Sequence, residues 1–144
     1  MQTIDSLSPD LQEKINAYST EFEDLFEAIE KIVYKSDFEL FKALLEELED
    51  INMQNKYGWT LLHITIRRDE RKMVELLLKS GADIDRVDGV GWTPLMESIM
   101  DDKPELCKLL VENGADKTIA NQRGATAPML AQKFGRANMY GYLS

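Results

Sequence analysis

The stretch Gly58-Trp59-Thr60-Leu61-Leu62 recurs 33 residues later as Gly91-Trp92-Thr93-Pro94-Leu95, and a looser copy, GATAP, follows at residues 124–128. The residues downstream repeat with the same period, since MVELLLKSGAD at 73–83 is matched by LCKLLVENGAD at 106–116. Self-similarity at a fixed period of roughly 20 to 50 residues is typical of arrays of stacked structural units. The sequence therefore predicts an array of repeats.

These repeats resemble the ankyrin-repeat family, in which a β-turn precedes two antiparallel helices and a Thr-Pro-Leu-His stretch begins the first helix. The stretch appears here as TLLH at residues 60–63 and as TPLM at residues 93–96. The resemblance implies an all-α solenoid of helix-turn-helix units joined by β-turn or hairpin loops. It also implies protein binding along the concave face, where the turn tips and the first helices meet.

Local chemistry predicts where these helices begin and end. Thr60 and Thr93 are suited to cap the first helices, because a hydroxyl at the N-cap accepts a bond from an unpaired backbone amide. Pro94 suits the first helical position, which needs no N–H. Gly81 and Gly114 suit the positions just past the second helices, where a left-handed backbone is common. Capping boxes predict further helix starts at Thr20 with Glu23, Ser36 with Glu39, and Asp102 with Glu105.

The period divides the chain into one domain with five parts. We expect an N-terminal helical extension at 1–21, a degenerate repeat at 22–50, clear repeats at 51–83 and 84–116, and a truncated C-terminal repeat at 117–144. Ser8 begins the extra helix of the extension, which we expect to cover the end of the stack. Leu48 stands where a glycine usually ends the second helix, so the turn after it is expected to differ.

Charge is unevenly distributed along the chain. The formal net charge is −9, and residues 1–50 hold 14 acidic and 4 basic residues against 12 and 13 in residues 51–144. This balance disfavours nucleic acid and anionic membranes, and it favours a protein partner that is possibly basic. The acidic N-terminal third is either a solvated face or a surface that attracts such a partner electrostatically. It is distant in sequence from the tryptophans, so two separable contact regions are possible.

Few residues could support chemistry. His63 is the single histidine, and the family resemblance implies a structural hydrogen-bonding role for it. Cys107, the single cysteine, is expected to be a buried apolar residue. The acidic stretch 83–89 lacks the ligand register of a calcium loop, so no metal and no cofactor are expected. No apolar run is long enough to span a membrane and no secretory signal is evident, which predicts a soluble cytoplasmic protein.

A candidate binding surface follows from mapping the concave face of the family onto this chain. The two tryptophans occupy equivalent positions of adjacent units, so they should stand side by side, either as binding anchors or as packing residues. The predicted partner-binding residues are Lys56, Tyr57, Trp59, Arg67, Arg68, Val90, Trp92, Met100, Asp101 and Arg123. Gln54, Val87, Gln122, Lys133 and Phe134 lie on the same mapped face.

Two functions remain open within this fold. The first is a non-catalytic interaction module that uses the aromatic residues as anchors, with Arg67, Arg68 and Asp101 as a polar rim. The second is an acidic stoichiometric inhibitor of a basic enzyme, such as an antitoxin-type or immunity-type protein that covers a nuclease. An enzyme is not expected, since it would need a deep pocket with perturbed carboxylates. Self-association through the tryptophan face is possible but not predicted.

Overall fold

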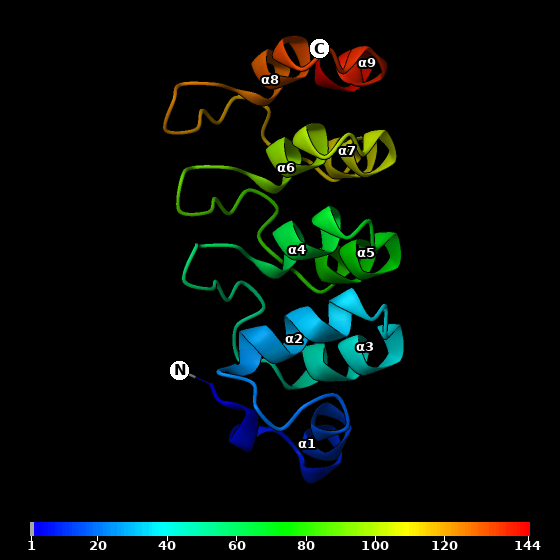
Figure 1. Ribbon diagram of the computed structural model, residues 1–144. Coiled ribbons are helices and arrows are strands. Elements are labelled where there is room, and N and C mark those ends of the chain that lie inside the picture. The colour runs from blue at the N-terminus through cyan, green and yellow to red at the C-terminus, as the bar shows by residue number, and fades with distance from the viewer. Residues whose placement is uncertain (1) are drawn as a thin grey trace.

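The computed structural model describes residues 2–144, and its helices form antiparallel pairs that stack in chain order (Figure 1). The 3₁₀-helix Ile4–Ser6 and helix α1 (Pro9–Asn16) precede the stack. The pairs are α2 (Leu25–Tyr34) with α3 (Phe38–Glu47), α4 (Leu61–Arg67) with α5 (Arg71–Lys79), α6 (Pro94–Met100) with α7 (Pro104–Glu112), and α8 (Ala127–Lys133) with the 3₁₀-helix Ala137–Met139 and α9 (Tyr140–Leu143).

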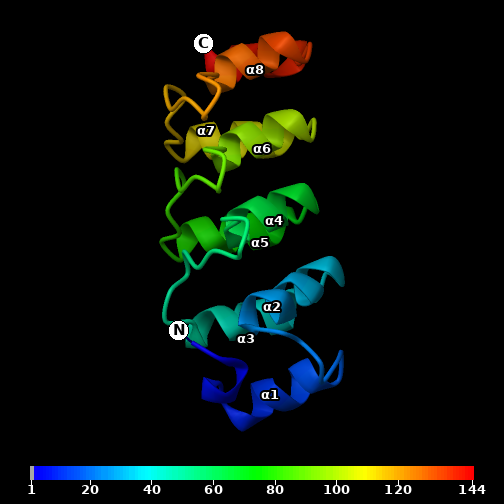
Figure 2. The same cartoon turned by 60° about the vertical axis from the view of Figure 1, so that its left-hand side comes forward.

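The stack has two helical layers and a row of loops. Helices α2, α4, α6 and α8 lie beside the loops, and α3, α5 and α7 form the second layer (Figures 1 and 2). The loops before α4, α6 and α8 project to the same side of the stack, which is the left in Figure 1. Within residues 2–144 there is no strand, and the single β-bridge joins Gln54 to Thr60. The expected all-α solenoid is therefore confirmed.

The predicted caps of the first helices are present. The hydroxyl of Thr60 accepts a bond from the His63 amide, and that of Thr93 accepts one from the Met96 amide at 3.1 Å. Pro94 is the first residue of α6. At the equivalent position Thr126 makes no side-chain cap bond. Gly81 and Gly114 have φ angles of 91° and 89°, as their place after a helix predicts.

The predicted capping boxes were wrong in position. Ser36 and Asp102 have φ angles of 55° and form the tight link between the paired helices, so each helix is capped one residue later. Asp37 caps α3 through its side chain, and Lys103 precedes Pro104 of α7 without a side-chain bond. Helix α2 begins after Asp24, whose carboxylate accepts from the amide of Glu27, instead of after Thr20. Short polar residues tolerate the left-handed backbone, which explains why the link uses Ser and Asp.

The predictions for the ends of the degenerate unit hold. Ser8 caps α1, and helix α1 packs against α3. Leu48 ends α3 with an extended backbone, φ −74° and ψ 132°, where the later units have a left-handed glycine. The turn into the first hairpin is therefore built differently from the later ones.

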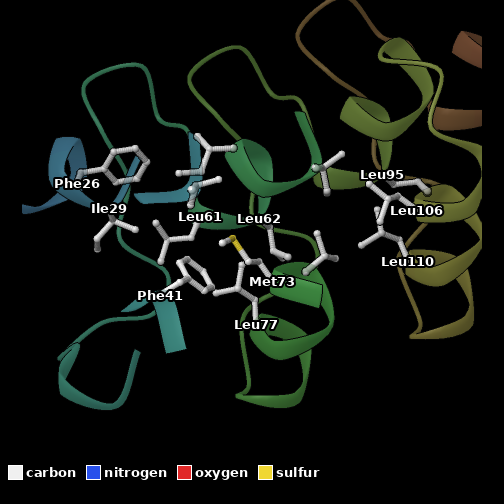
Figure 3. Packing of buried hydrophobic residues seen from close by; sticks show 14 of the residues in the cluster. Phe26, Ile29, Phe41, Leu61, Leu62, Met73, Leu77, Leu95, Leu106 and Leu110 are labelled. Carbon is white, nitrogen blue, oxygen red and sulfur yellow. The ribbon is translucent and has the colours of Figure 1, made fainter. Parts of the chain in front are cut away.

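One continuous apolar core runs through the stack. Figure 3 shows Phe26, Ile29 and Phe41 packing toward Leu61 and Met73, with further leucines continuing the contact into α6 and α7. Each unit leaves an apolar face that only its neighbour can cover, so stability comes from the interfaces between units. Within residues 2–144 no helix has the length and apolar character needed to cross a bilayer.

Candidate functional site

The hairpin tips are shaped by one repeated side-chain arrangement. The side-chain oxygen of Asn55 accepts bonds from the amides of Tyr57 and Trp59, both at 3.0 Å. Asp88 and Asn121 do the same in the next two units. A short polar side chain that bonds to the backbone two residues on stabilises a turn. The aromatic residues at the tips are therefore held on ordered turns.

Backbone bonds join neighbouring hairpins. The Gly89 amide donates to the Tyr57 carbonyl at 3.0 Å, and the Gln122 amide donates to the Val90 carbonyl at 3.3 Å. Gly58 has φ 79°, and a Cβ at this position would overlap the backbone nitrogen of Gly89. Close approach of two backbones thus requires glycine here. We call the surface formed by these hairpin tips and the adjoining sides of α2, α4, α6 and α8 the inner face.

Two large apolar side chains are exposed at the hairpin tips. Tyr57 and Val90 occupy equivalent positions and are 56% and 52% exposed. The Tyr57 ring lies 5.0 Å from the Trp59 ring, centroid to centroid, and Lys56 lies over its face at 5.3 Å. Both Trp59 and Trp92 are partly buried against the core. The ring in contact with that of Trp59 is Tyr57, from the same hairpin.

The two arginines at the end of α4 connect neighbouring units. The Arg67 guanidinium lies 4.0 Å from the centre of the Trp59 ring and donates to the carboxylate of Glu97 at 2.7 Å. The Arg68 guanidinium lies 3.8 Å from the centre of the Tyr34 ring, on α2. Cations over aromatic faces are stabilised by the ring quadrupole. These arginines therefore bridge units besides being accessible on the inner face.

Asp101, predicted from the sequence to lie in a polar rim, is half-buried just after α6. One of its carboxylate oxygens is buried without a hydrogen-bond partner. Burial, followed by the hydrogen bond and charge of Glu97, raises the pKa of Asp101 to about 7. The neighbouring Glu97 is 8% exposed. With its pKa raised to about 7, the Asp101 carboxyl is partly protonated near neutrality.

The remaining predicted residues lie toward the C-terminal part of the inner face. Arg123 is exposed at the third hairpin tip, next to Asn121, and Met100 is half-buried at the end of α6. Lys133 lies over the ring of Phe134 at 5.8 Å. The structure therefore places these residues apart from the Tyr57 and Trp59 cluster.

His63 and Cys107 are structural in this fold. The His63 ring bonds to the Thr60 amide through Nδ1 at 3.1 Å and to the Trp92 carbonyl through Nε2 at 2.9 Å, which ties two units together. Burial lowers the pKa of His63. Burial also raises the pKa of the Cys107 thiol to about 11, so the thiolate needed of a nucleophile is disfavoured. Among residues 2–144, no group of three His, Cys, Asp or Glu side chains is arranged around a metal-sized site.

The acidic and aromatic regions meet in space. A pocket of about 340 Å³ is lined by Glu23, Glu27 and Glu30 on one side and by Tyr57 and Trp59 on the other. Acidic and aromatic residues that are distant in sequence therefore line one pocket. Stacking places the degenerate unit directly beside the first hairpin, so charge that is distant in sequence becomes adjacent in space.

Two residues of this region were missed by sequence reasoning although a signal existed. Phe26 lies 33 residues before Trp59 and lines the same pocket, so the period could have found it. Glu97 lies at the position of Ile64 and Leu130, both buried apolar residues, so a carboxylate there is anomalous. A charge in a core position is the kind of exception that requires a partner.

Stacked helix pairs with hairpins along one side define a solenoid protein. Comparison with protein-family models matches residues 25–121 to ankyrin repeats. The chain belongs to the ankyrin-repeat family. A search of curated proteins found no matching relative. Ankyrin repeats are generally protein–protein interaction modules and are typically non-enzymatic.

Proposed function

We propose that this protein is a non-catalytic binding module that holds a protein partner on its inner face. The observation that carries the proposal is the exposure of Tyr57 and Val90 at consecutive hairpin tips, beside the half-buried Trp59. Aromatic side chains on rigid elements supply contact area at little entropic cost. Stacked hairpins joined by backbone bonds are such a rigid support.

The proposed contact set keeps eight of the ten residues predicted from the sequence, leaving out the half-buried Met100 and Asp101, and assigns them different tasks. Tyr57, Val90 and Arg123 are the exposed tip residues and would make the first contacts. Trp59 and Trp92 contribute their exposed edges, and Lys56 and Arg68 supply cations at the margin. Arg67 positions the Trp59 ring through stacking.

Substitution at the tips tests this placement. We expect the double variant Tyr57→Ala with Val90→Glu to lose proteins that the wild type captures from the native source, because both side chains point to solvent and contribute little to folding. The matched control is Tyr140→Ala, which removes an exposed tyrosine from α9. Equal capture by the wild type and the tip variant would overturn the proposed face.

The tryptophans need a separate measurement, since they also pack on the core. Trp59→Ala and Trp92→Ala are compared singly for unfolding free energy and for affinity to the captured protein. Loss of affinity beyond the loss of folded protein identifies a binding anchor. Loss of stability with unchanged affinity identifies a packing residue.

A second candidate is stoichiometric inhibition of a basic enzyme, and one observation favours it. The carboxylates of Glu23, Asp24, Glu27 and Glu30 line the same pocket as Tyr57 and Trp59. Acidic groups around an aromatic contact would steer a basic surface toward that contact. Inhibition of the captured protein at a one-to-one ratio separates this function from that of an adaptor.

A further inference from the structure

Two hollows flank a pair of carboxylates on α2. Glu27 and Glu30, here called the acidic ridge, line both hollows. The first hollow, about 340 Å³, has an aromatic wall of Phe26, Tyr57 and Trp59. The second hollow, about 550 Å³, has an aromatic wall of Tyr18, Phe22 and Tyr34. The surface therefore alternates apolar, acidic and apolar across one helix.

The carboxylates of this surface are not neutralised by the protein. Among the ion pairs formed within residues 2–144, none involves Glu23, Asp24, Glu27 or Glu30. The first hollow holds these four acidic groups against the single cation of Lys56, and the second holds Glu27 and Glu30 against Lys31. Partial burial raises the pKa of Glu30, more than Arg67 lowers it. A carboxylate that is partly dehydrated and unpaired gains most from an incoming cation.

Three of the six aromatic rings that line the hollows already have one of the protein's own cations over them. Lys56 lies over Tyr57, Arg67 over Trp59, and Arg68 over Tyr34. A cation from a partner would be repelled from these ring faces. The carboxylates are therefore the place for a partner's cation, and the remaining apolar surface of the hollows is the place for its apolar side chains.

We propose that this surface binds a basic segment of a partner protein, with an arginine or lysine paired to Glu27 and Glu30 and flanking apolar side chains in the two aromatic hollows. The proposal rests on the inner-face function and specifies its partner. Two hollows separated by a charged ridge require a ligand with apolar groups on both sides of a cation, which a peptide segment supplies. Phosphate-bearing partners are repelled by the same carboxylates.

The test uses the full chain and a defined probe. The probe is a fluorescein-labelled ten-residue peptide of alternating leucine and arginine, and binding is followed by fluorescence anisotropy. Two matched peptides carry citrulline in place of arginine, or serine in place of leucine. We expect both replacements to weaken binding by about tenfold, because each removes one of the two contact types.

Variants locate the binding. We expect Glu27→Gln with Glu30→Gln to weaken the leucine–arginine peptide by about tenfold. Glutamine at position 27 retains a side-chain oxygen that can accept the bond from the Glu23 backbone amide. A second double variant, Glu23→Gln with Glu30→Gln, leaves Glu27 unchanged. Glu46→Gln with Glu49→Gln changes net charge equally at exposed positions at the end of α3 and just after it. This control should bind as the wild type does.

Three results would overturn the proposal. These are no saturable binding of the peptide, equal weakening by the ridge and control variants, and equal binding of the arginine and citrulline peptides. If Tyr57→Ala weakens peptide binding while the ridge variants do not, the inner face still binds proteins and only the acidic ridge loses its role. Failure of both sets of variants to affect any partner would remove the inner-face function as well.

Discussion

At the scale of the residue, the repeat imposes requirements that differ between equivalent positions. Gly58 and Gly124 share a φ of 79°, yet only Gly58 faces the backbone of a following hairpin. Burial beside Glu97 raises the pKa of Asp101 to about 7, whereas its neighbour Asp102 is exposed. The repeat period determines the backbone conformation at each position. Contacts with the neighbouring unit determine how much a given side chain there stabilises or destabilises the fold.

Replacing Gly58 with alanine should destabilise the protein more than the same change at Gly124. Both substitutions force alanine into a left-handed backbone, at about 1 kcal/mol. Only the Cβ at position 58 also overlaps the backbone of Gly89, which adds about 1 to 3 kcal/mol. Urea unfolding of both variants measures the difference, and equal losses would contradict the close approach of the two hairpins.

The raised pKa of Asp101 predicts a pH dependence of stability. Between the ordinary value of 3.8 and about 7, the unfolded chain has released a proton that the folded protein retains. The free energy of unfolding contributed by this group therefore falls as pH rises through that window. Asp101→Asn removes the titration, so we expect a gain of about 1 kcal/mol at pH 8, discounted for partial solvent screening, and little change at pH 4.

Urea unfolding at pH 4, 6 and 8 provides the measurement for Asp101. Asp102→Asn is the control, because this exposed neighbour tolerates asparagine at its φ of 55°. Parallel pH curves for the wild type and Asp101→Asn would show that Asp101 does not retain this proton in the folded protein.

At the scale of the element, contacts between first helices hold the units in register. The ion pair of Arg67 and Glu97 joins α4 to α6, and the His63 ring joins α4 to the residue before the α6 cap. Arg68 and Tyr34 join α4 to α2. Polar links of this kind are directional, so they fix the rotation of one unit on the next more strongly than apolar burial alone.

Breaking the Arg67 and Glu97 pair from one side should cost more than replacing both partners. Arg67→Met leaves the nearly buried Glu97 carboxylate unpaired, and we expect a loss of about 2 kcal/mol. Adding Glu97→Leu places an apolar residue there, as Ile64 and Leu130 are at the equivalent positions of neighbouring units. The double variant should therefore recover most of the lost free energy of unfolding. A double-mutant cycle in urea measures the coupling.

Arg71→Met supplies the comparison for this ion pair. Arg71 pairs with Glu75 at the exposed surface, so replacing Arg71 should change the free energy of unfolding much less than replacing Arg67 does. A double variant no more stable than Arg67→Met alone would contradict the assigned role of the buried carboxylate.

At the scale of the whole molecule, stacking brings acidic residues of the degenerate unit next to aromatic residues of the following hairpin. Four carboxylates of the acidic N-terminal third, on Glu23, Asp24, Glu27 and Glu30, line the same pocket as Tyr57 and Trp59. Their charge would act on any partner that the proposed inner-face site holds. Charge of this kind raises association rates more than it slows dissociation.

The salt dependence of the association rate should distinguish an inhibitor of a basic enzyme from an adaptor whose partner has an uncharged surface. For the protein captured on the inner face, we expect the association rate to fall by about tenfold between 50 and 500 mM NaCl if its surface is basic. The dissociation rate should change little. The Glu27→Gln with Glu30→Gln variant should show a shallower decline, and a flat association rate in the wild type would remove the inhibitor hypothesis.

Sequence alone determined the fold and the interior of each unit. The 33-residue period, the threonine caps and the glycines after the second helices are local signals, because caps and left-handed turns depend on a few neighbouring residues. The link residues Ser36 and Asp102 were misassigned for the same local reason, since a short polar residue suits both an N-cap and a left-handed turn.

Only the tertiary structure determined which surface groups act together. Arg67 and Glu97, Arg68 and Tyr34, and the acidic ridge beside Tyr57 are contacts between units, and their partners lie about one repeat period apart. Stacking geometry decides these contacts, because the rotation and spacing of units select which side chains meet. The repeat in the sequence therefore predicted the array, and the stacking of that array turned an acidic segment and an aromatic tip into one candidate site.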